Sequence, residues 1–261
     1  MTTPIRRRAL VWRTSRFLGL LFAAAACGLT QPDVAPPADG SNGPDDPGGT
    51  DRSGFVVLLV GDPGSLNASE DALRDRLGRL DLEVRVRDDD GFATAHADGC
   101  DLVVMSKTVD SETVGTTLKP VSCPVVFWED NQQKLDMLAT IDNDGSGGTA
   151  WHSTGDDLFI RSDAPASLRA GLEGELDFYT RRDEITFSPR GELVADAIVV
   201  AEFDERGGNP AVYVLEGGAR LADGSRAAGR RVYFGLYDDT FRLLTSEGLA
   251  LFDAALGWAL R

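Results

Sequence analysis

The chain has 261 residues, enough for one large domain or two small ones, and its 42% hydrophobic and 26% charged residues are typical of a globular protein. Its net charge is -16, and without the five arginines of residues 1–27 the remaining 21 basic and 42 acidic residues give -21. Phosphate backbones repel a protein this acidic, so we expect no nucleic-acid partner, whereas cations and neutral ligands such as sugars remain compatible. Solubility alone is the simplest use of this charge.

The N-terminus has the three parts of an export signal. A basic segment is followed by an apolar run over residues 17–26 and then by Cys27. The apolar run is about ten residues long, too short to span a bilayer, which requires about 20. Small residues directly before a cysteine resemble a bacterial lipobox, in which that cysteine is acylated after cleavage. The resemblance predicts a signal peptide over residues 1–27 and an extracytoplasmic protein held to the lipid bilayer through Cys27. A secretory signal cleaved near Ala26 is the alternative, and Gly28 favours the outer membrane if the source is Gram-negative.

Residues 28–53 are rich in Pro, Gly, Asp and Ser and contain almost nothing to bury. Segments of this composition stay disordered, because they cannot offset the conformational entropy lost on folding. We therefore predict a disordered linker that separates the membrane anchor from a folded domain over residues 54–261.

The first half of this domain alternates between strand and helix patterns. Residues 55–60 form a continuous apolar run, as in a strand buried on both faces of a parallel sheet. A helix capped by Ser69 and a shorter helix over residues 111–118 are expected from their apolar spacing and flanking polar residues. Further strands are predicted over residues 82–86, 102–105 and 125–128. This alternation predicts a doubly wound α/β sheet.

The second half is richer in strand patterns. Turn signals such as Gly207-Gly208-Asn209-Pro210 separate several of them. A final helix is predicted after a cap at Thr245, because apolar side chains from Leu249 to Leu260 form one stripe. The predicted strands of this half lie over residues 158–160, 176–178, 185–187, 197–200, 211–214 and 232–236.

Several segments resemble a domain found in many secreted bacterial proteins, similar to class I glutamine amidotransferases and to the trehalose-utilisation (ThuA-like) family. The resemblance rests on residues 233–241, 244–245 and 251–259, with Gly61-Asp62-Pro63-Gly64 and residues 101–106 fitting the front of the same domain. It implies a flavodoxin-like, mostly parallel sheet with helices on both faces and a β-rich second half, and ligands at the carboxyl ends of the strands. It also implies an association with carbohydrates.

The catalytic signature of the amidotransferases does not match this chain. Their nucleophile is a cysteine on a tight strand-to-helix turn, and here the corresponding strands are followed by Ser106-Lys107 and Glu129-Asp130. Neither stretch is a G-x-C-x-G or G-x-S-x-G elbow. We therefore predict that the amidotransferase activity does not carry over and that the domain is more plausibly a binding module than an enzyme.

Two cysteines in the domain precede neighbouring predicted strands at the same offset. Cys100 lies two residues before Leu102, and Cys123 lies two residues before Val125. Adjacent strands are about 4.8 Å apart, close to the Cα separation that a disulfide accepts. The extracytoplasmic compartment permits oxidation, so we predict a structural Cys100–Cys123 disulfide at the amino ends of the strands.

Polar and aromatic side chains follow the predicted strands where ligands bind in open α/β sheets. Their carboxylates could hold a hard cation such as Ca²⁺, hydrogen-bond sugar hydroxyls beside Trp128 or Trp151, or act as general acid and base. The simpler alternative is that the acids cap the following helices and stay solvated. The candidate residues of this strand-end rim are Asp62, Ser106, Lys107, Trp128, Glu129, Asp130, Asp238 and Asp239.

No cofactor is expected from the sequence, although Ca²⁺ remains possible. Residues 142–145 resemble part of a calcium loop, but the twelve-residue spacing would end on Trp151, so a glycine-rich turn is the better interpretation. His96 and His152 lie too far apart in sequence for a zinc motif. Three hypotheses stay open: a non-catalytic domain for a carbohydrate or envelope ligand, a carboxylate- or Ca²⁺-dependent hydrolase, and a structural lipoprotein without a small ligand.

Overall fold

The computed structural model describes residues 54–79, 83–146, 151–203 and 208–261. The predicted signal peptide, Cys27 and the linker over residues 28–53 lie outside the described residues. Among the helices that are described, none is both long and apolar enough to cross a membrane.

Five parallel strands form the first half of the central sheet. They are β1 (Phe55–Val60), β2 (Glu83–Asp88), β3 (Leu102–Met105), β4 (Val125–Phe127) and β11 (Arg231–Phe234), in the spatial order β2-β1-β3-β4-β11. The run of six buried residues in β1 forms a strand with neighbours on both edges and cover on both faces, as its continuous hydrophobicity predicts. The predicted α/β class is confirmed.

Four antiparallel strands extend the sheet beyond β11 in the order β10-β9-β6-β7. Their bounds are Asn209–Leu215 for β10, Ile198–Phe203 for β9, Asp157–Ile160 for β6 and Gly174–Asp177 for β7. A separate two-stranded sheet pairs β5 (His152–Gly155) with β8 (Asp183–Thr186). The second half is therefore rich in strands, as the sequence predicts. Most of its strands belong to the same sheet as the parallel strands but run antiparallel to their neighbours.

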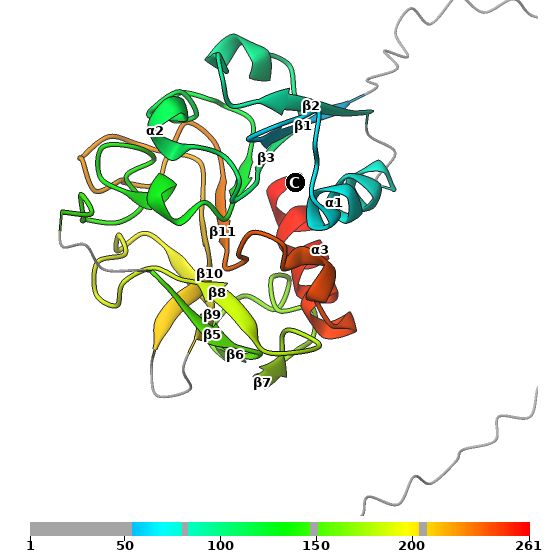
Figure 1. The fold of residues 1–261 in the computed structure, drawn as a ribbon. Coiled ribbons are helices and arrows are strands. Elements are labelled where there is room, and N and C mark those ends of the chain that lie inside the picture. The colour runs from blue at the N-terminus through cyan, green and yellow to red at the C-terminus, as the bar shows by residue number, and fades with distance from the viewer. Residues whose placement is uncertain (1–53, 80–82, 147–150, 204–207) are drawn as a thin grey trace, which may run out of the picture. The chain divides into compact units, whose positions relative to one another are not determined.

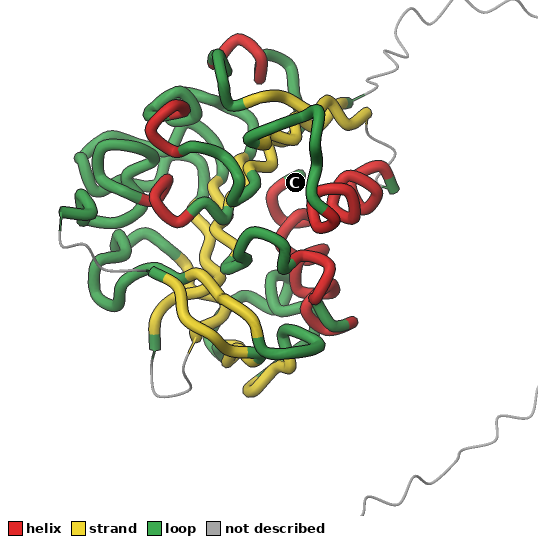
Figure 2. Tube along the Cα trace, in the orientation of Figure 1, coloured by secondary structure: helices red, strands yellow, loops and turns green. Residues whose placement is uncertain are grey.

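Helices cover both faces of the sheet (Figures 1 and 2). The two longest, α1 (Ala68–Gly78) and α3 (Ser246–Ala259), lie on one face, and the short α2 (Ser111–Val114) lies on the other. Side chains alternate along β1 between the two hydrophobic cores: Val56, Leu58 and Val60 pack with the helices α1 and α3, and Phe55, Val57 and Leu59 pack on the opposite face. Short 3-10 turns complete the chain at Thr94–Ala97 (η1), Asp130–Gln133 (η2) and Phe241–Leu243 (η3).

Two predicted helix boundaries are wrong. Helix α1 is capped by Asn67 and not by Ser69, because the Asn67 side chain accepts from the Glu70 N–H while Glu70 accepts from the Asn67 N–H, a capping box. Helix α2 ends at Val114 because Gly115 has a φ of 51°, which stops the helical hydrogen-bond pattern. The predicted cap of α3 is confirmed: the Thr245 hydroxyl accepts from the Gly248 N–H at 3.0 Å.

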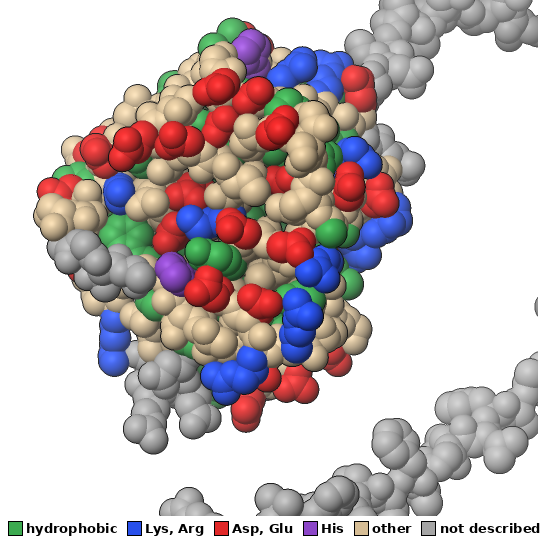
Figure 3. Space-filling model, viewed as in Figure 1, with side chains coloured by type: hydrophobic (Ala, Val, Ile, Leu, Met, Phe, Trp, Pro, Cys, Tyr) green, Lys and Arg blue, Asp and Glu red, His purple; other side chains and the backbone are tan. Residues whose placement is uncertain are grey.

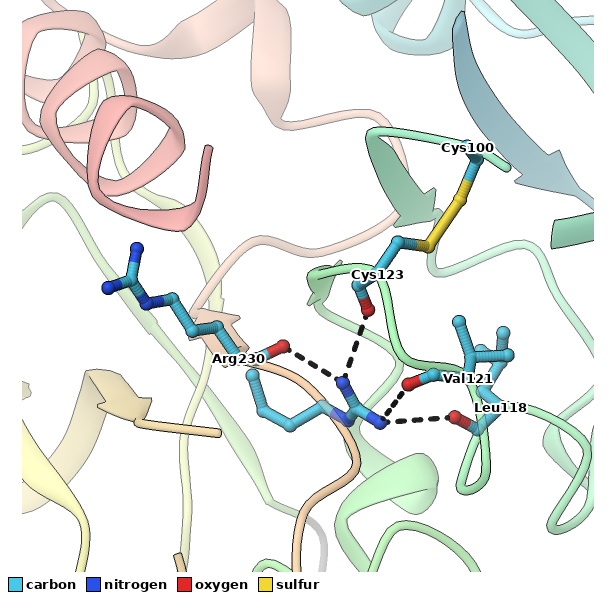
Figure 4. The surroundings of a disulfide bond; sticks show 6 residues. Cys100, Leu118, Val121, Cys123 and Arg230 are labelled. Atoms are coloured by element: carbon cyan, nitrogen blue, oxygen red, sulfur yellow. Dashed lines mark hydrogen bonds between the residues drawn. A yellow bond between two sulfur atoms is a disulfide. The ribbon is translucent and has the colours of Figure 1, made fainter. Parts of the chain in front are cut away.

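The amino ends of β3 and β4 are joined by the Cys100–Cys123 disulfide, as predicted. The two strands are parallel neighbours, and the Cα atoms of the cysteines are 6.3 Å apart, within the range of native disulfides. Beside it, the carbonyl oxygens of Leu118, Val121, Cys123 and Arg230 converge on one guanidinium group, that of Arg231 (Figure 4).

Arg231 is 1% exposed and forms no ion pair with any described residue. Its shortest hydrogen bond, to the Val121 carbonyl, is 2.8 Å, and burial lowers its pKa to about 10. The guanidinium therefore remains charged at neutral pH, and main-chain carbonyls rather than a carboxylate stabilise it. It ties the segment before β4 to the start of β11.

Candidate functional site

The carboxyl ends of β3 and β4 bring three of the predicted rim residues into direct contact. The Lys107 Nζ atom lies 2.7 Å from Glu129 Oε2 and 2.7 Å from Asp130 Oδ1. Lys107 comes directly after the β3 segment, and the two acids follow β4, which pairs with β3 in parallel. Residues 22 and 23 positions apart are therefore placed together by sheet topology alone.

This ion triad is largely removed from water, which changes how its members hold protons. Burial raises the pKa of Glu129 to about 7, and the repulsion from Asp130 adds to this effect while Lys107 opposes it. Burial alone would lower the pKa of Lys107, but the attraction of Glu129 and Asp130 outweighs it and raises that pKa. One ammonium thus interacts with two carboxylates, and of these Glu129 has the raised pKa.

An aromatic ring and a histidine join this triad from other segments. The Lys107 Nζ atom lies 5.6 Å from the ring centre of Tyr237, within the range of a cation–π contact. The His152 ring lies 4.9 Å from the Tyr237 ring, and its Nδ1 atom is 3.3 Å from Glu184 Oε1. We call the whole group the rim cluster; it consists of Lys107, Glu129, Asp130, His152, Glu184, Tyr237 and Asp238.

The separate two-stranded sheet supplies His152 and Glu184, and a glycine allows it to approach. A Cβ atom at Gly235 would collide with the carbonyl oxygen of Thr186, so only glycine permits this contact between the end of β11 and β8. Gly235 also accepts a main-chain hydrogen bond from the Thr186 N–H at 3.3 Å. Sequence reasoning missed His152, Glu184 and Tyr237 as site residues, and the glycine directly after β11 is the one signal that points to this contact.

Asp238 is the exposed member of the rim cluster and forms no ion pair with any described residue. Desolvation of its carboxyl group raises its pKa, Lys107 opposes the rise, and the negative charges of Glu184, Glu70 and Asp130 increase it. On the face displayed in Figure 3, acidic side chains are spread over much of the surface, with basic side chains between them. The rim cluster has four carboxylates and one lysine, so it carries excess negative charge.

Ser106 belongs to a neighbouring hydrogen-bond network rather than to the rim cluster. Its hydroxyl donates to Glu70 Oε1 at 2.7 Å, and the Thr108 hydroxyl donates to the same oxygen at 2.6 Å. Gly61 completes the network, because its N–H donates to Thr108 Oγ1 and a Cβ there would collide with the Thr108 carbonyl. The network joins the ends of β1 and β3 to the start of α1.

Two predicted rim residues make contacts away from the triad, Asp62 within a turn and Asp239 with the start of α1. Asp62 is exposed and accepts from the Gly64 N–H at 2.8 Å. Asp239 accepts from the Ser69 N–H at 3.1 Å and pairs with Arg242. Neither side chain contacts the triad around Lys107 in the described part of the chain.

The two tryptophans that the sequence analysis placed beside a possible sugar, Trp128 and Trp151, are both buried. Trp128 is 2% exposed and packs in the core beneath α1 and α3, and Trp151 is 4% exposed. A buried indole offers no free face to a sugar ring, so neither residue can provide a stacking platform. Within residues 54–79, 83–146, 151–203 and 208–261, no group of three or more His, Cys, Asp or Glu side chains is arranged to hold a metal ion.

The sequence matches no protein-family model and no curated protein. Among solved structures, a putative ThuA-like protein from Bacteroides uniformis superposes with a TM-score of 0.51 at 12% identity, over 82% of this chain and 94% of that one. The domain therefore has a ThuA-like fold. A glutamine amidotransferase from Methylobacillus flagellatus superposes with a TM-score of 0.39 at 13% identity, over 78% of this chain and 91% of that one, a similarity too low to add to the argument.

On this ThuA-like fold, no described serine or threonine hydroxyl is hydrogen-bonded to a histidine. The Ser106 hydroxyl is engaged by Glu70, and no histidine contacts it. His96 Nδ1 accepts from a main-chain N–H, and His152 lies beside Glu184. Cys100 and Cys123 are joined to each other at the opposite ends of the strands. The arrangement suits binding by ion pairs, hydrogen bonds and an aromatic ring.

Proposed function

We propose that this protein is an exported, lipid-anchored binding protein whose ThuA-like domain holds a carbohydrate or another cell-envelope ligand on the rim cluster. The export signal and the acylated cysteine are predicted from residues 1–27, and residues 28–53 serve as the spacer. The excess of acidic residues disfavours nucleic acids and leaves neutral or cationic ligands.

One observation carries the proposal. Side chains from the ends of β3, β4 and β11 and from the β5–β8 sheet converge on one place, with Lys107 bound by Glu129 and Asp130 beside the ring of Tyr237. Carboxylates are strong hydrogen-bond acceptors for hydroxyl groups, and the carboxyl ends of parallel strands are where open α/β sheets bind ligands. A polyhydroxylated ligand fits this chemistry.

A second candidate, a carboxylate-dependent hydrolase, is favoured by the state of Glu129. Burial raises the pKa of this group to about 7, which suits a general acid or base at neutral pH. The Ca²⁺-dependent form of this candidate is weaker, because the ammonium of Lys107 already lies between Glu129 and Asp130. We therefore rank binding before catalysis.

A thermal-shift titration of the purified full-length chain against a glycan panel tests the proposal. We expect one glycan class to raise the melting temperature in a concentration-dependent way, because a ligand at about 100 times its Kd stabilises the native state by about 2.7 kcal/mol. Asp238→Asn should remove the shift. The matched control Asp62→Asn, at an exposed strand-end acid outside the rim cluster, should keep it.

Two results would contradict the proposal. If no glycan shifts the melting temperature, or if Asp238→Asn and Asp62→Asn weaken binding equally, the rim cluster is not a glycan site. If glycan is turned over and Glu129→Gln abolishes turnover while the protein stays folded, the hydrolase replaces the binding protein.

A further inference from the structure

The surroundings of the Lys107 ammonium are those of a bound primary amine. Its Nζ atom lies 2.7 Å from one carboxylate oxygen of Glu129 and 2.7 Å from one of Asp130. The centre of the Tyr237 ring is 5.6 Å from the same Nζ atom. Charge-assisted hydrogen bonds and an aromatic ring are the means by which proteins recognise an ammonium group. The ammonium group of Lys107 thus lies where the ammonium group of a ligand could bind.

The rim cluster has more negative charge than this lysine balances. Asp238 has no cationic partner in the described part of the chain, and the ion-pair partner of Glu184 there is His152. The carboxylates of Glu184, Glu70 and Asp130 all raise the pKa of Asp238, after desolvation, which is the larger cause. A cationic ligand arriving here would relieve repulsion among carboxylates from several different segments.

A buried polar atom below the triad is unsatisfied. The Tyr233 side chain is 0% exposed, and its hydroxyl has no hydrogen-bond partner among the described residues. Tyr233 pairs with Phe127 of β4, the strand that leads into the triad. After burial, the charges of Asp130 and Glu129 raise its pKa, while the nearby Thr186 side chain opposes the rise. Buried hydroxyls are nearly always hydrogen-bonded, so the Tyr233 hydroxyl marks a position where a water or a ligand group fits.

We propose that the rim cluster recognises a primary ammonium group, that Lys107 occupies this position in the free protein, and that the ligand is a small hydroxylated amine of the amino-sugar class. The proposal rests on the proposed function, in which the rim cluster is the ligand site. The long, flexible lysine side chain can withdraw, and exchange of one ammonium for another keeps Glu129 and Asp130 paired throughout. The ligand's hydroxyl groups would find acceptors in Asp238 and Glu184.

Calorimetric titration of the full-length chain with three matched sugars tests the ligand class. Glucosamine has the ammonium group, N-acetylglucosamine has the same ring with that group blocked, and glucose has a hydroxyl in its place. We expect glucosamine to bind at least about tenfold more tightly than the other two, because only it replaces the Lys107 ammonium. Equal binding of all three would overturn this inference while leaving the proposed function standing. Cadaverine binding as tightly as glucosamine would overturn the amino-sugar class.

Removal of Lys107 tests its role as the occupant. Lys107→Met should bind glucosamine about tenfold or more tighter than the wild type, because the ligand no longer competes with a tethered ammonium. Unchanged or weaker binding by a folded Lys107→Met protein would overturn the inference.

Chemical rescue keeps the inference testable if removal of Lys107 impairs folding. Ethylamine should raise the melting temperature of Lys107→Ala in a concentration-dependent way, relative to the same concentration of NaCl, and should leave the wild type unchanged. Lys119→Ala is the matched control, since Lys119 pairs with the single carboxylate of Asp223 at the surface. Absence of rescue in Lys107→Ala would overturn the inference. Rescue without any sugar binding would retain the ammonium site and reject the proposed glycan function.

Discussion

The two ends of the parallel strands are built in opposite ways. At the amino ends, a disulfide joins β3 to β4, and Arg231 is satisfied by main-chain carbonyls, so the strand starts are fixed covalently and by hydrogen bonds. At the carboxyl ends, Glu129 and Asp130 share one lysine, Glu184 lies beside His152, and Asp238 has no cationic partner among the described residues. The amino edge is therefore fixed by covalent and hydrogen bonds, whereas the rim cluster has negative charge that no described cation balances.

Shape alone would point to the other edge. A hollow of ≈ 380 Å³ lies at the amino ends of the strands, lined by residues that include Thr94, Asp98, Ser122 and the disulfide. Asp101 also lines it, and the Oδ2 atom of this carboxylate is buried without a hydrogen-bond partner among the described residues. The ion triad of Lys107 and the adjacent Tyr237 ring, rather than concavity or unmet hydrogen bonding, single out the rim cluster as the proposed ligand site, and the predictions below separate the two edges.

The largest expected effect is on the amino edge. Arg231→Met removes the donor from a set of buried carbonyls, and we expect the free energy of unfolding to fall by about 4 kcal/mol. Urea denaturation measures this loss, and the exposed Arg220→Met provides a matched control that should change stability by less than about 0.5 kcal/mol. If Arg231→Met costs no more than its control, the guanidinium does not hold this edge together.

Removal of the disulfide should cause the next largest loss of unfolding free energy. A Cys100→Ser, Cys123→Ser double variant opens a loop with a sequence separation of 23 residues, and chain entropy predicts a loss of about 3 kcal/mol. Dithiothreitol should destabilise the wild type by a similar amount and leave the double variant unchanged. Glycan binding by the folded double variant should match binding by the wild type. A loss of binding would show that the rim cluster depends on the disulfide edge.

A smaller effect is expected from Glu129 and depends on pH. Its folded pKa of about 7 lies above the ordinary value of 4.5, so its contribution to stability is fully present below about pH 4.5 and is lost as the pH rises through about 7. Glu129→Gln should therefore reduce the decline in unfolding free energy between pH 5 and pH 8 by about 1–3 kcal/mol. Urea denaturation at a series of pH values measures this, with the exposed Glu175→Gln as control. A decline as steep in Glu129→Gln as in the wild type would show that this carboxyl group has an ordinary pKa.

Local patterns in the sequence predict the strands of the parallel half well: β1, β3 and β4 are short apolar runs, and β2 alternates between apolar and charged residues. The alternation of these strands with helices predicts a parallel α/β topology. The disulfide follows from the same topology, since equal offsets before parallel neighbours place Cys100 beside Cys123. The burial of Trp128 could have been predicted too: side chains alternate along a strand, so Trp128 shares the core face of Val126.

The missed part of the site depends on contacts between segments that no local pattern connects. His152 and Glu184 enter the rim cluster because β5 pairs with β8 and this sheet meets the end of β11 at Gly235. The cap of α1 was misassigned for a related reason: the Ser69 hydroxyl accepts from the Arg242 N–H, a tertiary contact, while Asn67 forms the cap. Polar residues near a helix start compete for several roles, and the tertiary structure decides among them.

Hydrogen exchange measured by mass spectrometry on the full-length chain, with and without saturating glucosamine, tests the central claim most directly. The account predicts slower exchange in residues 106–110, 129–134 and 236–240 around the rim cluster, and no change in residues 97–101 and 120–124 beside the disulfide. Protection confined to the segments beside the disulfide would place the ligand at the amino edge and contradict the account.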